Sequence, residues 1–127
     1  MQKKKKRTPR GNMLLWIKAL RSGEYTQAQG VLGCVDTQGE ESNCCLGVAC
    51  RVLGEERAFG EFTKVLEYGG MRDLLNPTQR KKLGLTKDQV DYLVDLNDGE
   101  DGVGGATFDE IATHIEQTIL PRLPKGC

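Results

Sequence analysis

The segment NCCLGVACRVLG (residues 43–54) constrains the fold more than any other part of the chain. On helical spacing its apolar side chains surround the whole axis: Cys45, Leu46, Val48, Ala49, Cys50, Val52 and Leu53. A helix that is apolar on every side lies inside a core rather than on a surface. Gly47, which has no side chain, would let a second backbone approach this helix closely. The segment therefore predicts a central buried helix over Cys45–Leu53.

The residues before this helix predict an amphipathic helix and then a small β-hairpin. Asn12 is placed to cap the first helix, whose apolar positions are Met13, Leu14, Ile17 and Leu20. A polar, glycine-bearing stretch follows from Gln27 to Glu41 and predicts a hairpin with its turn near Gln38-Gly39. Ser42 or Asn43 is then placed to cap the buried helix.

Three further helices are expected towards the C-terminus, after a stretch (residues 55–72) whose apolar spacing fits helix or strand. Asn76-Pro77 has the form of a cap followed by proline at the first helical position. Two capping boxes, Thr86–Gln89 and Thr107–Glu110, each precede an amphipathic pattern. The last helix places its apolar residues on one stripe and ends near Pro121: Phe108, Ile111, Ala112, Ile115 and Ile119.

These elements predict one α+β domain that is mostly helical, with a small hairpin and a central buried helix. The chain has 127 residues, of which 38% are hydrophobic and 28% charged, which suits a single globular domain. We expect a disordered basic arm over residues 1–11, a globular domain over 12–120 and a short tail over 121–127. No apolar run approaches the roughly 18 residues of a membrane span.

Charge is distributed unevenly, although the formal net charge is zero. Six of the 18 basic residues lie in the first ten positions, and none of the 18 acidic residues does. The arm could therefore contact nucleic acid or another polyanion, or it could be a solvated tail. It carries no aromatic residue for base stacking. From Asn97 to Leu120 the chain has six acids and no Lys or Arg, which predicts a face that repels nucleic acid.

The adjacent Cys44 and Cys45 allow two interpretations. At a helix N-terminus a thiol has a lowered pKa, so either cysteine could act as a nucleophile with His114. His114 lies off the apolar stripe of its helix, which favours the second interpretation, that the cysteines are core residues. The cysteine spacing lacks paired Cys-x-x-Cys units, and the acidic loop (residues 97–105) fails the EF-hand register. No catalytic residue, metal site or cofactor is therefore predicted.

A polar cluster follows the first helix and is the candidate ligand site. Arg21, Tyr25, Gln27 and Gln29 combine a cation, an aromatic ring and amides, which suit an anionic or planar ligand. Asn97 and Asp98, which precede the glycine-rich loop, complete the candidate ligand-binding set.

The order of several motifs resembles a family of small bacteriophage proteins of unknown activity. The motifs are W..ALRSG.Y.Q (from Trp16), CCLGV.C (from Cys44), LNPTQRKKLGL (from Leu75), LND (from Leu96) and TF.EIA..IE (from Thr107). Together they cover most of the chain, whereas the basic arm and the long loop (residues 99–105) depart from the family. The resemblance implies a phage protein and supplies no catalytic residue.

We therefore expect a non-enzymatic accessory protein in the cytoplasm of an infected host cell. It would bind a host protein, or sequester a small anionic or nucleotide signal as a counter-defence. Two alternatives stay open: a cysteine-dependent hydrolase or transferase using Cys44 or Cys45 with His114, and a nucleic-acid accessory protein using the basic arm. No membrane partner is expected, and the oligomeric state is left open.

Overall fold

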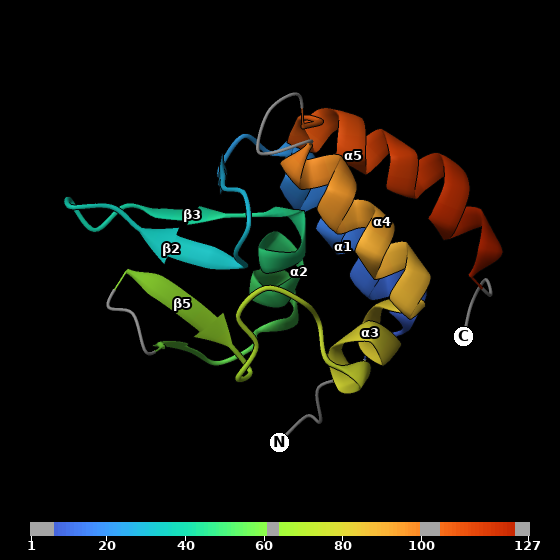
Figure 1. Ribbon diagram of the computed structural model, residues 1–127. Helices are drawn as coiled ribbons and strands as arrows, with labels where there is room; N and C mark the ends of the chain where they lie inside the picture. Colours follow the sequence, from blue (N-terminus) through green and yellow to red (C-terminus); the bar gives the residue numbers. More distant parts are fainter. Residues whose placement is uncertain (1–6, 61–63, 100–104, 124–127) are drawn as a thin grey trace, which may run out of the picture.

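A five-stranded sheet lies beside a layer of five α-helices in the computed structural model (Figure 1). The structure describes residues 7–60, 64–99 and 105–123. In chain order the elements are α1 (Pro9–Arg21), β1 (Thr26–Gln27), β2 (Gly33–Val35), β3 (Glu41–Asn43), α2 (Cys45–Leu53), β4 (Arg57–Phe59), β5 (Val65–Tyr68), α3 (Pro77–Leu83), α4 (Lys87–Asp98) and α5 (Phe108–His114). A π-helix (Ile115–Ile119) and a 3₁₀-helix (Leu120–Arg122) extend α5. The prediction of a mostly helical α+β domain is confirmed.

The sheet has the strand order β1-β3-β2-β5-β4, with β1 parallel to β3 and the other pairs antiparallel. Strands β2 and β3 form the expected hairpin. Its turn is closed by Asp36, whose carboxylate accepts from the N–H groups of Gln38 and Glu40 at 2.8 and 2.9 Å, and Gly39 takes a φ of 81°. The sheet is larger than the predicted hairpin because β4 and β5 also belong to it. Both strands lie within residues 55–72, whose apolar spacing fits helix or strand. Burial alternates along β5, where Leu66 and Tyr68 face the core.

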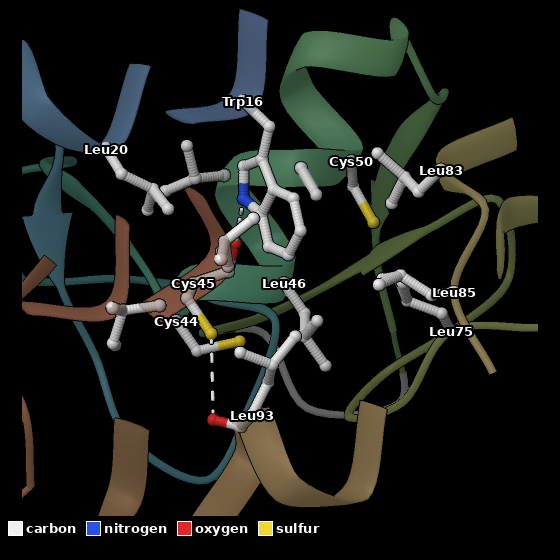
Figure 2. Packing of buried hydrophobic residues seen from close by; sticks show 14 of the residues in the cluster. Trp16, Leu20, Cys44, Cys45, Leu46, Cys50, Leu75, Leu83, Leu85 and Leu93 are labelled. Carbon is white, nitrogen blue, oxygen red and sulfur yellow. Dashed lines mark hydrogen bonds between the residues drawn. The ribbon is translucent and has the colours of Figure 1, made fainter. Parts of the chain in front are cut away.

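Helix α2 has the predicted bounds and lies at the centre of the core, packed against α1 and α4. Trp16 of α1 donates from Nε1 to the carbonyl of Cys45 at 2.8 Å, and the Cys45 thiol donates to the carbonyl of Leu93 of α4 at 3.7 Å (Figure 2). Helix α5 packs against α1 and α4 with its predicted apolar stripe buried. Among the described residues no helix is long and apolar enough to cross a membrane.

Two helix caps differ from the prediction. Helix α1 begins at Pro9 with Thr8 as its cap, so residues 9–11 of the expected arm are helical. The side chain of Asn12 instead donates to the carbonyl of Lys82 at 2.7 Å, inside the fold. Helix α2 is capped by the Cys44 thiol, which accepts from the Gly47 N–H at 3.4 Å. The cap of α3 and both predicted capping boxes are present.

Gly47 is the point where the sheet side of the molecule meets α2. A Cβ built there would lie 1.8 Å from the carbonyl oxygen of Leu32, which is far inside van der Waals contact. The contact is with backbone rather than with a flexible side chain, so it cannot be relieved by rotation. The predicted close approach of a second backbone is therefore present, and its partner is the segment before β2.

Gly47→Ala should destabilise the protein by at least about 3 kcal/mol, at the upper end of ordinary overpacking, because the backbone of Leu32 must move. Urea unfolding followed by circular dichroism measures this loss. Gly11→Ala is the matched control in α1, where the new Cβ meets side-chain atoms only, the Thr8 hydroxyl at 3.3 Å and the Arg7 Cβ at 4.0 Å. It should stay within about 1 kcal/mol of wild type, and equal losses in the two variants would contradict the close approach.

Candidate functional site

The paired cysteines are core residues, and their thiols are poor nucleophiles. Cys44 is 5% exposed and Cys45 is fully buried. Burial raises the pKa of Cys44 to about 11 and the pKa of Cys50 to about 12, and it holds the pKa of Cys45 well above its ordinary value. Hydrogen bonds from backbone N–H groups oppose the shift at Cys44 and are outweighed. The expectation of a lowered pKa at the helix N-terminus is therefore wrong, because desolvation exceeds the effect of the helix end.

His114 lies on the outward side of α5, away from the cysteines. Its ring packs against Tyr92 of α4, with the two ring centroids 5.0 Å apart and the planes tilted by 35°. Thr118, one turn later, contacts the ring nitrogens and donates to the His114 carbonyl at 2.6 Å. The structure does not assemble His114 with Cys44 or Cys45 as a catalytic pair.

The first four candidate ligand residues turn to different partners. Arg21 forms two hydrogen bonds with the Glu116 carboxylate of the π-helix, at 2.9 and 3.1 Å. The hydrogen bond from Arg21 lowers the pKa of Glu116. The guanidinium of Arg51 lies over the ring of Tyr25, with Cζ of Arg51 4.8 Å from the ring centroid.

Gln27 and Gln29 also differ from Arg21 and Tyr25 in their surroundings. The Gln27 amide donates to Asn97 Oδ1 at 3.0 Å and to the carbonyl of Ala106 at 2.8 Å, while Gln29 is exposed. The segment from Arg21 to Gln29 therefore holds α5, α2 and α4 to one another, and its side chains do not converge on one ligand.

Asn97 has a structural role that consumes its hydrogen-bonding capacity. Its Oδ1 accepts from the Cys45 N–H at 3.0 Å, and its Nδ2 donates to the carbonyl of Ala28 at 2.8 Å. Asp98 accepts from the Gly30 N–H at 3.1 Å. Both line a small cavity of about 220 Å³, the cysteine cavity, formed by Gly30, Val31, Cys44, Cys45, Leu46, Asp73, Leu74, Val94, Asn97 and Asp98. Its described lining has two acids and no base, which does not suit an anionic ligand.

A buried polar network at Glu41 was not foreseen from the sequence. The Glu41 side chain is 12% exposed; its carboxylate pairs with Arg57 and accepts from the Tyr68 hydroxyl. The Asn43 amide donates to the same hydroxyl at 2.8 Å and accepts from Arg51 at 3.3 Å. Burial raises the pKa of Tyr68, which keeps it a donor. The network ties three strands to α2, and its members are too far apart in sequence to reveal it.

A second cavity, of about 550 Å³, lies between the start of α1 and the end of α3. This basic cavity is lined by Arg7, Pro9, Asn12, Leu53, Thr78, Lys81 and Lys82. Arg7 is held by a hydrogen bond to the carbonyl of Val52 at 3.0 Å, and Lys82 lies 3.4 Å from Glu55. Asn12 is 5% exposed, and its Oδ1 has no hydrogen-bond partner among the described residues. Three positive side chains and one unpartnered acceptor therefore share one hollow.

A third cavity of about 280 Å³ lies beside the ring pair of Tyr92 and His114. This aromatic cavity is lined by Asp88, Gln89, Tyr92, His114, Thr118, Ile119 and Arg122. Its residues come from the first half of α4 and from the segment around the π-helix. The sequence pattern gave no sign of it, because it depends on where α4 lies against α5.

A family model described as a domain of unknown function, DUF8296, matches residues 13–80, more than half of the chain. The chain belongs to this family. The DUF8296 match includes α1 from Met13 onward, the whole sheet, α2 and the first part of α3, and it ends just before Lys81 and Lys82. No curated protein and no solved structure matches the chain. The family therefore places the sheet and the buried helix within a shared domain and assigns no activity.

Alkylation by iodoacetamide should leave Cys44 and Cys45 unmodified in the folded protein at pH 8. With a pKa of about 11, only about 0.1% of Cys44 would be thiolate at that pH, and the reactive fraction should rise about tenfold for each further pH unit until the pKa is reached. Half-buried Cys34 should react faster, and peptide mass spectrometry resolves the sites. Rapid labelling of Cys44 at pH 7 would contradict its burial.

Tyr68→Phe should destabilise the fold by about 1–3 kcal/mol, because Glu41 loses a buried hydrogen-bond donor. Tyr92→Phe removes the same hydroxyl from a side chain that is 53% exposed and should change stability by less than about 0.5 kcal/mol. Chemical denaturation of both variants measures the difference. Equal, small effects would show that the network does not stabilise the sheet.

Proposed function

We propose that the protein is a non-enzymatic accessory protein that binds nucleic acid through its basic end. The observation that carries the proposal is the basic cavity, where Arg7, Lys81 and Lys82 line a hollow with no acidic side chain in its described lining. In the sequence, four consecutive lysines precede Arg7. The basic cavity and the run of lysines next to Arg7 in the sequence together carry the positive charge that a phosphate backbone attracts.

The chemistry of the cavity suits phosphate groups. Lysine ammonium groups act as compact point charges on phosphate oxygens, and arginine adds directed donors. Lys81 is exposed, and Arg7 is already oriented by its bond to Val52. Lysines in the last turn of α3 also complement the helix dipole, but that effect does not require a hollow or a neighbouring arginine.

The other cavities support anion binding less well. The cysteine cavity has Asp73 and Asp98 in its lining, and the thiols beside it are protonated at neutral pH because burial raises the pKa of Cys44 to about 11. A small nucleotide shares the phosphate chemistry of a nucleic acid, so a sequestered nucleotide signal is the smaller version of the same proposal. The lysine-rich arm favours the polymer, because a single nucleotide has too few phosphates to engage both arm and cavity.

The resemblance to small phage proteins supports the setting of this proposal, an infected host cell. An accessory protein there meets host and phage nucleic acids at high concentration. The proposal remains one of binding without chemistry, in agreement with the separation of His114 from the cysteines.

Lys81→Gln combined with Lys82→Gln should weaken binding to a fluorescent oligonucleotide on the order of tenfold at low salt. The slope of log K against log salt should fall by about 1.4 for a single strand, since each lost phosphate contact removes about 0.7. Fluorescence anisotropy over a salt series measures both values.

The matched control is Lys18→Gln combined with Lys64→Gln, which removes two exposed charges outside the cavity. It should retain most of the affinity and slope. Equal losses in the two double variants would mean that only net charge matters, and no binding by wild type would reject the proposal. Mononucleotides are titrated in parallel, and tighter binding of a mononucleotide than of the strand would favour the signal-sequestering version.

A further inference from the structure

The aromatic cavity has the chemistry of a base-binding site. Tyr92 is 53% exposed although it is a large aromatic residue, and its ring and that of His114 lie together, 5.0 Å apart, at the cavity. The two rings pack on each other with their planes tilted by 35°, and the exposed ring of Tyr92 offers a surface on which a planar heteroaromatic group can stack. Gln89 and Asp88 stand on the same lining and can hydrogen-bond the edge of such a group.

The π-helix shapes this cavity. From Ile115 to Ile119 the backbone makes i→i+5 hydrogen bonds, and the Leu120 N–H donates to the carbonyl of Ile115. Short π-helical segments are rare and occur frequently at functional sites. Here the segment lies between His114 and Arg122, and Thr118 within it contacts the His114 ring at 3.2 Å. The π-helix therefore contributes Thr118 and Ile119 to the cavity lining, and His114 and Arg122 line the cavity just before and just after it.

The aromatic cavity and the basic cavity lie at the same end of the molecule. Gly84, which ends α3, is contacted by both Pro9 and Leu123: a Cβ built there would meet their side chains at 3.3 and 2.5 Å. Pro9 lines the basic cavity, and Leu123 follows Arg122 of the aromatic cavity. Figure 1 shows α3, the start of α4 and the end of the α5 extension at this end. Chain contacts therefore connect the two hollows through Gly84.

The two cavities carry different charges and would therefore bind different parts of a nucleotide. The basic cavity attracts phosphate, whereas Asp88 in the aromatic lining and exposed Asp91 beside Tyr92 repel it. A base is neutral, and its amino groups can donate to the Asp88 carboxylate. A duplex presents phosphates on its outside and keeps its bases stacked inside, so it cannot satisfy the aromatic cavity.

From this geometry we infer that the bound nucleic acid is single-stranded, with an unpaired base stacked on the exposed ring of Tyr92, beside His114, while its phosphates occupy the basic cavity. The inference rests on the proposed function and specifies its ligand. Arg122, which also lines the aromatic cavity, adds a cation near the bound base.

The test compares a single strand of about 12 nucleotides, within the range of small single-strand sites, with the duplex of the same sequence. The full-length protein is titrated at one salt concentration, and the strand carries 2-aminopurine as a fluorescent base. Wild type should bind the single strand more tightly than the duplex and should change the 2-aminopurine emission. Tyr92→Leu should weaken single-strand binding about fivefold or more, as the loss of one stacked base predicts, and leave duplex binding unchanged.

Two further variants serve as controls. Tyr92→Phe keeps the ring and should recover most of the single-strand affinity that Tyr92→Leu loses, which separates stacking from loss of the hydroxyl. Phe59→Leu removes an exposed aromatic ring from β4, away from both cavities, and should have no effect. Thermal unfolding of each variant verifies that it is folded.

The outcomes separate this inference from the proposed function. A duplex preference, or equal loss of single-strand and duplex binding in Tyr92→Leu, would overturn the single-strand inference while nucleic-acid binding stands. Single-strand binding that is unaffected by Tyr92→Leu would do the same. If wild type binds neither nucleic acid, both proposals are rejected.

Discussion

The structure depends on the first turn of α2, where Cys45 is held from two sides. Its N–H is one of the donors that a helix start leaves without an intrahelical acceptor, and Asn97 accepts it at 3.0 Å. Trp16 donates to its carbonyl, and its thiol donates to Leu93 (Figure 2). These groups are buried, so losing one partner would leave a polar atom unpaired at a cost of about 1–3 kcal/mol. One residue therefore fixes α1 and α4 together, and the contact between Gly47 and Leu32 brings the sheet against the same helix.

The features that could be predicted from the sequence are those that depend on residues close together in the chain, such as the bounds and caps of the helices. The apolar run gave the bounds of α2, and the i, i+3 spacing of Thr86 with Gln89 gave the start of α4. The Glu41 network and the Gln27–Asn97 contact join residues far apart in the chain, and no local pattern contains them. The side chains predicted to form the ligand site do not meet, again because their partners lie far away in the chain. A cation, a ring and an amide close in sequence suggested a pocket, yet each side chain points to a different helix.

The cysteines illustrate how burial decides chemistry. A thiol at a helix start and a histidine later in the chain resemble parts of a catalytic set, but desolvation raises the pKa of Cys44 to about 11, and His114 packs on Tyr92. The core around α2 is therefore a support rather than a reaction centre. The two cavities that carry the proposed function lie instead at the α3 end of the helical layer, one between the start of α1 and the end of α3 and the other beside Tyr92 and His114. The DUF8296 match ends before Lys81 and covers none of the residues that line the aromatic cavity.

If the protein binds its ligand at the α3 end, and not at the cysteines, amide chemical-shift mapping by NMR will locate the site. On titration with a single-stranded oligonucleotide we expect the largest shifts at Arg7, Lys81, Lys82 and the residues around Tyr92, with little change at Cys44 and Asn97. Shifts concentrated around the cysteine cavity, with the α3 end unaffected, would contradict binding at that end.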